Sequence, residues 1–172
     1  MNDDAEMDIL TAGLDEGFAR AVAETRGGEA IRKCYICGTC SASCPVCGVD
    51  PSFDPRRVIR MILLGMKREV FESEFMWLCA GCGICTDRCP QGVCVSEIMV
   101  IVRNLAAREG FMHRSYRLQV GELLKYGRLY EASPYNKKRA KTNLPPLKDD
   151  FGPVVKIMEK TGLRTLAGEE KK

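Results

Sequence analysis

The sequence predicts a mainly α-helical fold, and three observations lead to this prediction. Apolar residues recur at helical spacing in the segments that follow two cysteine-rich runs. The long segment between Cys44 and Cys79 carries the same helical pattern, not alternating short strands. Helix start and stop signals, such as Asp54-Pro55 and Gly110, stand at the ends of these apolar stripes. Each cysteine run is thus followed by one amphipathic helix, which indicates an approximate internal duplication.

Residues 1–27 are expected to form an acidic arm and a first helix. Asp15 is the predicted N-cap of a helix that runs to about Thr25, and Gly27 and Gly28 follow it as a stop signal. One apolar stripe of this helix comprises Leu14, Phe18 and Val22. The surplus of acidic residues in this segment is either a solvated face or a docking surface for a basic partner.

Two cysteine runs share the spacing C-x2-C-x2-C-x3-C-P. The first comprises Cys34, Cys37, Cys40 and Cys44, and the second Cys79, Cys82, Cys85 and Cys89. This spacing is typical of ligands to [4Fe–4S] cubes, in which three thiolates of one loop each reach a different iron. The fourth Cys, followed by Pro, ligates the other cube in two-cluster proteins. We therefore expect crossed ligation: Cys34, Cys37, Cys40 and Cys89 hold cluster 1, and Cys79, Cys82, Cys85 and Cys44 hold cluster 2.

Zinc sites and disulfides explain these cysteines less well than clusters do. Structural zinc sites close with four ligands in two pairs and have no need of a third and fourth Cys before Pro, twice. Disulfides need an oxidising compartment, and the first residues contain no pattern typical of an export signal. Cys47 follows Cys44 at x2 spacing and leaves some ambiguity about the fourth ligand, although only Cys44 precedes Pro as Cys89 does. Cys47 and Cys94 are otherwise expected to be free or buried thiols.

The helices between and after the runs have recognisable starts. Asp54 at N-cap and Pro55 at N1 begin a helix that is expected to reach Met66. Ser73 can cap a shorter helix that leads into the second run, where Trp77 is expected to pack in the core or to shield a cluster. A further helix is predicted from Ser96 to about Glu109, and its apolar stripe comprises Ile98, Ile101, Val102 and Leu105.

The C-terminal part is expected to hold one helix and an extension. The spacing predicts a helix over 115–126 that Gly127 ends, and a short helix over 151–161. Residues 133–150 lack a hydrophobic period and are predicted to be a loop. This loop is either flexible and solvated or an extended arm whose basic run meets an acidic partner surface.

The helical spacer between the runs favours an α-helical ferredoxin-like domain, as found in iron–sulfur subunits of large redox complexes. Three parts are expected along the chain. They are an acidic arm and helix at 1–27, the domain for two [4Fe–4S] clusters at 28–112, and a C-terminal helix with a partner-binding extension at 113–172.

Composition and motifs exclude several function classes. The formal charge is +3, but each cluster with its thiolates adds about −2, so the loaded chain is roughly −1. Nucleic-acid binding is not expected from that charge, and no apolar run is long enough for membrane insertion. One His, His113, stands without catalytic neighbours in sequence, and no dinucleotide or phosphate-binding fingerprint occurs. The sequence therefore predicts an electron relay in a reducing cytoplasm.

The stretch from Phe18 to Val46 reads FARAVAETRGGEAIRKCYICGTCSASCPV. Together with the Trp-Leu-Cys that ends at Cys79 and the helix after the second run, it resembles the C subunit of heterodisulfide reductase, HdrC. The likeness extends from about Leu14 to about Tyr130. It implies that the eight cysteines of the two runs ligate the clusters, and it gives no ligand role to Cys47 or Cys94.

The resemblance also implies partners in an oxidoreductase complex. Electrons would come from HdrA, a flavin-containing, electron-bifurcating partner with its own iron–sulfur clusters, and pass to HdrB, the disulfide-reducing partner. A hydrogenase, a formate dehydrogenase or an NADH-oxidising module would complete the wider complex. In methanogens the substrate is the mixed disulfide of coenzymes M and B. Two alternatives stay open from the residues: the iron–sulfur subunit of a succinate- or glycolate-type dehydrogenase, and a non-redox zinc-binding interaction module.

Overall fold

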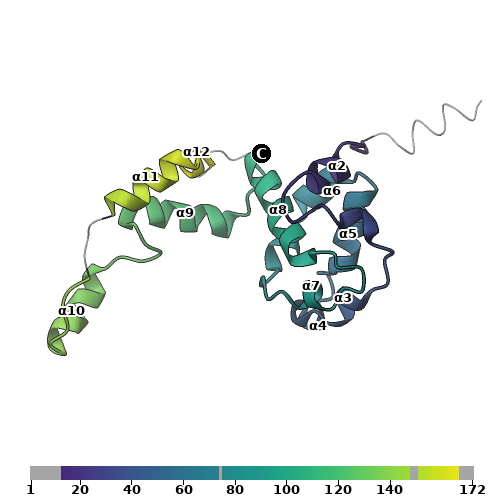
Figure 1. Ribbon diagram of the computed structural model, residues 1–172. Helices are drawn as coiled ribbons and strands as arrows, with labels where there is room; N and C mark the ends of the chain where they lie inside the picture. Colours follow the sequence, from purple (N-terminus) through teal and green to yellow (C-terminus); the bar gives the residue numbers. More distant parts are fainter. Residues whose placement is uncertain (1–12, 74, 148–150, 167–172) are drawn as a thin grey trace, which may run out of the picture. The chain divides into compact units, whose positions relative to one another are not determined.

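The structure is a computed structural model that describes residues 13–73, 75–147 and 151–166. In these ranges the regular structure is entirely helical (Figure 1), which confirms the predicted mainly α fold. The chain divides into two compact units, Met1–Ala106 and Ala107–Lys172. No helix within the described ranges has the length and apolar character that a membrane span requires.

The first unit contains both cysteine runs. Its helices are α2 (Phe18–Ala23), η1 (Ile31–Lys33), α3 (Thr39–Ala42), α4 (Pro45–Val49), α5 (Pro55–Leu63), α6 (Lys67–Glu72), η2 (Phe75–Leu78), α7 (Ile84–Asp87) and α8 (Val95–Arg108). α5 contacts α2, α3 and α6 and is the central helix of this unit. The rings of Phe18 and Phe71 meet edge to face with centroids 5.4 Å apart, and both side chains are buried. Burial of such side chains provides most of the favourable free energy of folding.

The start of α5 confirms the predicted cap. A carboxylate oxygen of Asp54 accepts a hydrogen bond from the backbone N–H of Arg57 at 3.1 Å, and Pro55 is the first helical residue. The helix ends at Leu63, slightly before the expected Met66, because Gly65 turns the chain with φ +75°. α6, which follows this turn, was not predicted from the sequence.

Two other predicted caps are wrong for a shared reason. The carboxylate of Asp15 accepts from the backbone N–H of Gly17 at 2.8 Å, a local turn that precedes α2 instead of starting it. The hydroxyl of Ser73 donates to the carbonyl of Val70 at 2.6 Å and so closes the end of α6. Short polar side chains satisfy nearby backbone groups in turns as readily as at helix starts, so their identity alone does not fix a helix boundary.

Asp15 also connects the segment before α2 to the turn between α5 and α6. Its backbone N–H donates to the carbonyl of Gly65 at 2.7 Å, and its carboxylate lies 3.5 Å from the ammonium of Lys67. Leu14, the first member of the predicted stripe, is 38% exposed, whereas Phe18 and Val22 are buried. The stripe prediction therefore holds for the last two residues only.

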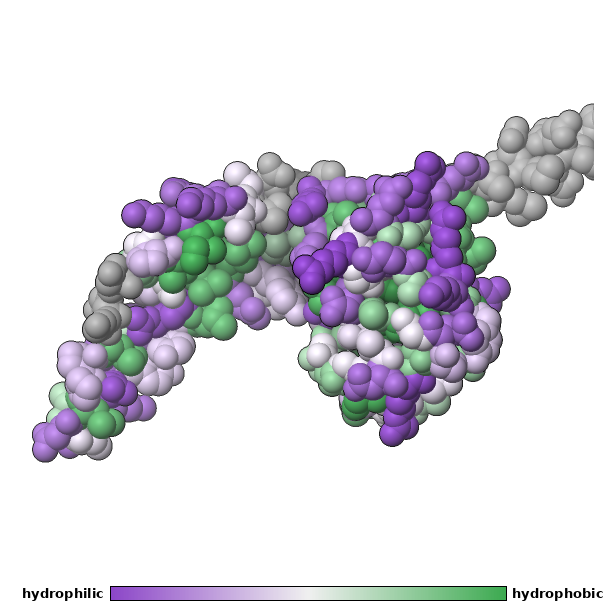
Figure 2. All heavy atoms as spheres, viewed as in Figure 1, coloured by the Kyte–Doolittle hydropathy of each residue, from purple (hydrophilic) through white to green (hydrophobic). Residues whose placement is uncertain are grey.

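The second unit contains α9 (Arg114–Tyr126), α10 (Ser133–Lys141), α11 (Gly152–Lys160) and α12 (Leu163–Leu166). α9 matches the predicted range, with the His113 ring nitrogen as its N-terminal acceptor and Gly127 at φ +65° as its stop. α11 contacts α9, and hydrophobic side chains gather along these two helices in Figure 2. Val120 and Met158 are buried in this small core.

The prediction of a loop over 133–150 is wrong for the range that α10 covers. Pro134 lies in the first turn of this helix, where its missing N–H costs nothing, and the lysines and arginine that follow are good helix formers. No residue of α10 is buried, so an apolar period could not have revealed it. Residues 148–150 of the predicted loop and 1–12 of the predicted acidic arm lie outside the described residues.

Candidate iron–sulfur site

The two cysteine loops have the same backbone conformation. In the first loop Ile36 and Gly38 have φ values of +60° and +89°, and in the second Gly81 and Gly83 have +67° and +81°. In both loops these residues flank the second cysteine, Cys37 or Cys82. Left-handed residues on both sides of one cysteine turn the chain tightly, so that neighbouring thiols can face one centre. Ile36 adopts this conformation at a steric cost that glycine avoids in the second loop.

The positive φ values predict that alanine substitutions at two exposed glycines, Gly81 and Gly48, change the free energy of unfolding in opposite directions. A Cβ added at Gly81 meets nothing within 4 Å, so Gly81→Ala has only the cost of its positive φ. We expect it to lower the free energy of unfolding by about 1 kcal/mol. Gly48, in α4, is equally open but has no positive φ, so Gly48→Ala is the matched control and should raise stability by about 0.5–1 kcal/mol. Anaerobic urea unfolding followed by circular dichroism measures both; equal changes in the two variants would contradict the proposed strain.

A hydroxyl residue directly after the third cysteine of each loop binds the helix that follows. The Ser41 oxygen accepts from the backbone N–H of Arg56 at 3.1 Å, in the first turn of α5. The Thr86 oxygen accepts from the backbone N–H of Ser96 at 3.0 Å, in the first turn of α8. Each bond satisfies one of the donors that a helix start leaves free. The internal duplication thus extends to the contact between loop and helix.

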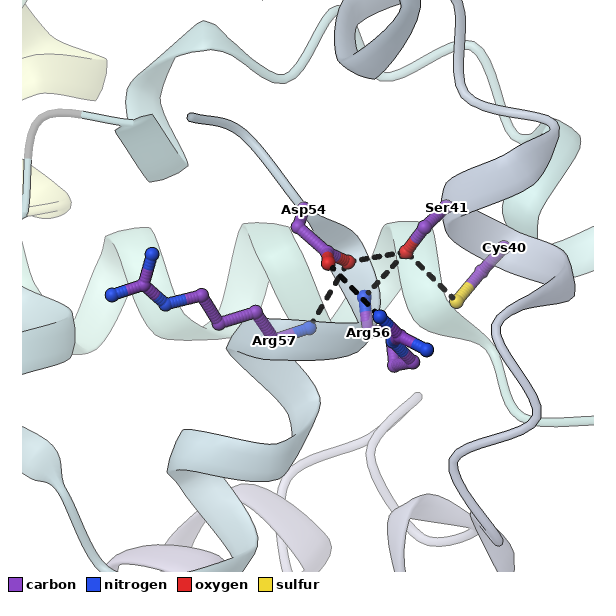
Figure 3. Close-up of polar contacts among 5 residues, drawn as sticks. All are labelled: Cys40, Ser41, Asp54, Arg56 and Arg57. Atoms are coloured by element: carbon purple, nitrogen blue, oxygen red, sulfur yellow. Dashed lines mark hydrogen bonds and ion pairs between the residues drawn. The ribbon is translucent and has the colours of Figure 1, made fainter. Parts of the chain in front are cut away.

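In the first loop this contact includes a carboxylate (Figure 3). The Ser41 hydroxyl donates to Asp54, whose carboxylate also lies 3.7 Å from the guanidinium of Arg56. The Ser41 oxygen is 3.9 Å from the sulfur of Cys40. Burial by itself raises the pKa of the Asp54 carboxyl, but the bond from Ser41, that from the Arg57 N–H and the charge of Arg56 together lower it. Asp54 is therefore ionised at neutral pH and fixes the start of α5 against the loop.

Two pockets in the first unit are each lined by four cysteines. The first cysteine pocket is lined by Cys34, Cys37, Cys40 and Cys89, and the second cysteine pocket by Cys44, Cys79, Cys82 and Cys85. Their volumes, including the part open to solvent, are about 320 and 370 Å³. The structure therefore brings together the two sets of four that crossed ligation predicts. α3 carries Cys40 and α7 carries Cys85, the third cysteine of each loop. These two helices contact each other and so bring the two runs together.

None of the ten cysteines forms a disulfide. In the described part of the chain, no three His, Cys, Asp or Glu side chains converge on one point as the ligands of a single metal ion would. The eight cysteines of the two runs surround the pockets instead, and a [4Fe–4S] cube accepts one thiolate at each of its four irons. Cys47 and Cys94 are half-buried and line neither pocket.

Comparison with known proteins agrees with this geometry. A family model described as a 4Fe–4S dicluster domain matches residues 30–93. The C2 subunit of the "H(2)/formate:CoB-CoM heterodisulfide,ferredoxin reductase" of Methanococcus maripaludis is 36% identical over 90% of this chain and 86% of its own length. The C subunit of the "H(2):CoB-CoM heterodisulfide,ferredoxin reductase" of Methanothermobacter marburgensis is 30% identical over 95% and 92%. The chain belongs to the HdrC family, the C subunits of heterodisulfide reductases.

A further relative, the iron–sulfur C subunit of the "CoB--CoM heterodisulfide reductase" of Methanopyrus kandleri, is 38% identical over 56% of this chain and 50% of its own length. As a member of the HdrC family, the chain is an iron–sulfur electron-transfer subunit of an oxidoreductase, and it carries two [4Fe–4S] clusters. Each cluster, when bound, accepts and releases one electron at a time.

Both pockets lie at helix N-termini, which suit groups of negative charge. Arg56 of α5 and Val95 of α8 line the first cysteine pocket, while Pro55 of α5 and Ser96 of α8 line the second. The N-terminal end of a helix carries a partial positive charge from its free N–H groups. In this HdrC family member, helix ends at both pockets would favour the more negative, reduced state of a cluster held there.

Burial affects the thiols of the two loops unequally. Burial raises the pKa of the Cys85 thiol to about 11, with a further increase from the nearby Cys79, and it also raises the pKa of Cys40. The exposed Cys37 differs, because the hydrogen bond with the Thr39 hydroxyl lowers the pKa of its thiol. These half-buried thiols lose their protons when they bind a metal, so we expect cluster binding to stabilise the folded chain.

Thr39 is expected to adjust the potential of the cluster that the first loop ligates. Its hydroxyl lies 3.4 Å from the sulfur of Cys37, and since a ligating thiolate has no proton, the hydroxyl donates. The equivalent position in the second loop is Ile84, which cannot donate. A donor stabilises the reduced cluster more than the oxidised one, so Thr39→Val should lower the potential by on the order of 20–40 mV, or about 0.5–1 kcal/mol.

The matched experiment uses the second loop. Ile84→Thr should raise the potential of the other cluster by a similar amount, and anaerobic redox titration followed by EPR measures both variants. If the reduction potential of this cluster is the same in Thr39→Val as in the unchanged chain, the Thr39 hydroxyl does not donate to the Cys37 sulfur.

Several residues that shape the site were missed by the sequence analysis. The Arg103 guanidinium of α8 donates to the carbonyls of Met76 and Cys79, at 3.0 and 2.7 Å, and so holds the chain at the start of the second loop. Nothing in the sequence distinguishes Arg103 from other helical arginines. The hydroxyls of Ser41 and Thr86 had a detectable signal, because both directly follow the third cysteine of a repeated motif.

Proposed function

We propose that this chain relays electrons between the flavin-containing HdrA and the disulfide-reducing HdrB of a heterodisulfide reductase complex. Two [4Fe–4S] clusters in crossed ligation form the relay. Cluster 1 is ligated by Cys34, Cys37, Cys40 and Cys89, and cluster 2 by Cys79, Cys82, Cys85 and Cys44. The observation that carries this proposal is the pair of similar pockets, each lined by one of these sets of four.

The arrangement of the first unit supports an electron relay more than a substrate-binding site. The contact between α3 and α7, which carry Cys40 and Cys85, keeps the two pockets near each other. Electron tunnelling weakens steeply with distance, so short separation is the main requirement for a relay. With crossed ligation, each cluster would also link the first cysteine run to the second. These links would hold the two runs together and so stabilise the first unit against unfolding.

The remaining chemistry of the circuit is inferred from the relatives. The names of the M. maripaludis and M. marburgensis proteins specify the CoB-CoM heterodisulfide and ferredoxin as reactants. We infer the same class of disulfide for HdrB of this complex, and a bifurcating flavin in HdrA as the electron source. A hydrogenase or formate dehydrogenase module upstream is consistent with those names, and a reducing cytoplasm suits a chain of thiolate-held clusters.

The C-terminal unit is proposed to bind the other proteins of the complex. Leu118 on α9 and Ile157 on α11 are more than half exposed, at 61% and 62%, although their neighbours Val120 and Met158 are buried. Exposed large aliphatic side chains on a small unit of this kind are typical of surfaces that a partner covers. α10 adds three basic residues in its last turn, Lys138, Arg139 and Lys141, to the charge of this unit.

The test is an anaerobic purification through a tag on this chain, with iron determination and mass spectrometry of the proteins that accompany it. About eight irons, a flavoprotein and a cysteine-rich reductase are the expected result. Eight irons with a succinate- or glycolate-type flavoprotein, or with a membrane anchor, would retain the relay and refute the heterodisulfide circuit. About four irons would refute the two-cluster relay itself.

A further inference from the structure

A surface groove lies next to the first cysteine pocket. It shares two lining residues with that pocket and none with the second cysteine pocket. Its volume, including the part open to solvent, is about 1140 Å³. The lining residues shared with the first cysteine pocket are Ile36 and Arg56. The rest of the groove is formed by one side of α5 and by the start of α6. An occupant of this groove would therefore lie against the wall of the first cysteine pocket.

The exposed charge of the groove is positive. Arg56, Arg57 and Arg60 all line it from α5, and all three are exposed. Two acidic residues also line it. Asp54 is half-buried, accepts from the Ser41 hydroxyl and the Arg57 backbone N–H, and lies 3.7 Å from the guanidinium of Arg56, so its charge offsets that of one arginine only. Glu69 is the one acidic side chain of the lining that is exposed. A planar guanidinium forms bidentate hydrogen bonds with carboxylates, so this surface favours an acidic partner.

Apolar and aromatic groups accompany the arginines. Leu64, which lines the groove, is 51% exposed, and Tyr35, next to the shared residue Ile36, is 59% exposed. In the sequence Tyr35 stands between Cys34 and Ile36, which both line the first cysteine pocket. Tyrosine and arginine around an exposed aliphatic residue are the composition typical of the energetic centre of a protein interface.

The second cysteine pocket has a different surrounding. Its lining contains no charged side chain among the described residues, and Ser96 is its one polar residue besides the cysteines. Near its loop, Leu78 is 48% exposed and Ala80 is exposed. The two ends of the relay thus offer a partner different chemistry, basic beside the first pocket and uncharged beside the second.

We propose that the groove formed by Arg56, Arg57 and Arg60 is the docking site of an acidic redox protein that exchanges one electron with cluster 1. The inference rests on the proposed relay function and adds the chemistry of one partner and the end of the relay at which it docks. The step is a one-electron exchange: the reduced donor loses one electron and the oxidised cluster gains it. Attraction between opposite charges raises the association rate and makes it sensitive to salt.

The experiment uses the full-length chain loaded with both clusters, and a strongly acidic two-[4Fe–4S] ferredoxin as the probe. Stopped-flow absorbance gives the second-order rate constant for electron transfer from the reduced ferredoxin. Interferometry with the immobilised oxidised ferredoxin gives Kd, a readout independent of turnover. Arg57→Glu and Arg60→Glu, singly and together, reverse charge in the groove, and Arg20→Glu on α2 makes the same charge change at an exposed residue outside it.

The double variant should lose tenfold or more in rate constant and affinity at low ionic strength, and its salt dependence should flatten. Arg20→Glu should change both by less than about twofold. Groove variants that behave like Arg20→Glu would overturn the docking site. A second overturning result is displacement of the ferredoxin by millimolar inorganic phosphate at constant ionic strength, because the groove would then bind a small anion and not a protein surface.

The proposed function fails in a different way from the docking site. Iron content and full reduction of both clusters by dithionite test the relay and do not depend on the groove. A chain that holds both clusters and accepts dithionite electrons, but shows no difference between groove variants and Arg20→Glu, keeps the relay and loses the docking site. Circular dichroism of each variant loaded with both clusters shows whether a lost rate comes from lost folding. If Arg60→Glu is unfolded, Arg60→Gln replaces it with the same comparison.

Discussion

Replacing Cys89 with Ala should remove the cluster ligated by Cys34, Cys37 and Cys40 and leave the cluster of its own sequence neighbours in place. Cys89 lines the first cysteine pocket with those three cysteines, although it follows Cys85 in the sequence. Its sulfur also accepts from the backbone N–H of Val93 at 3.3 Å, so the side chain is fixed at this wall. The expected iron content falls from about eight to about four per chain.

Iron content alone does not show which cluster is lost, so the measurement uses pairs of substitutions. Cys37 and Cys82 are the exposed second cysteines of the two loops. If ligation is crossed, Cys89→Ala with Cys37→Ala affects one cluster and should retain about four irons, whereas Cys89→Ala with Cys82→Ala affects both and should retain almost none. If ligation is not crossed, the two results exchange. The Cys44→Ala pairs give the reciprocal test with the same two partners.

Much of the site could be predicted because its signal is local. The repeated cysteine spacing identifies the eight thiols, and Asp54-Pro55 identifies the start of α5, since both depend on residues a few positions apart. The helices that were missed or misplaced lack such signals. α10 has no buried residue and therefore no apolar period, and α6 is a single short segment between two turns.

Contacts between distant residues could not be predicted from the sequence. The bond between Ser41 and Asp54 joins a loop to a helix cap, and the bonds from Arg103 reach across from α8 to the second loop. The place of Ser41 after Cys40 marks the serine but does not identify Asp54 as its partner, and Arg103 looks like any other helical arginine in the sequence. The predicted cap at Asp15 failed for a related reason, because its carboxylate and backbone N–H found partners in a local turn and at Gly65.

Replacing Phe18 with Ala should give the largest loss of stability expected from a residue outside the pockets. Phe18 is 1% exposed and meets Phe71 edge to face, so its removal leaves a cavity between α2 and α6. Truncation of a buried phenylalanine costs about 3–5 kcal/mol in free energy of unfolding. α2 also contacts η1, which leads directly into Cys34, and α5, which lines the first cysteine pocket. The cavity therefore weakens the support of the first pocket as well as the core.

The measurement follows anaerobic urea unfolding of the full-length loaded chain in two ways. Circular dichroism reports loss of helix, and bleaching of visible absorbance reports loss of clusters; both should move to lower urea in Phe18→Ala. Leu14→Ala is the matched control, because Leu14 belongs to the same predicted stripe but is 38% exposed. Its cost should stay at about 1 kcal/mol or less. Equal losses in the two variants would mean that α2 is held by its whole stripe and not by the Phe18–Phe71 contact, since only Phe18 fills the cavity beside α6.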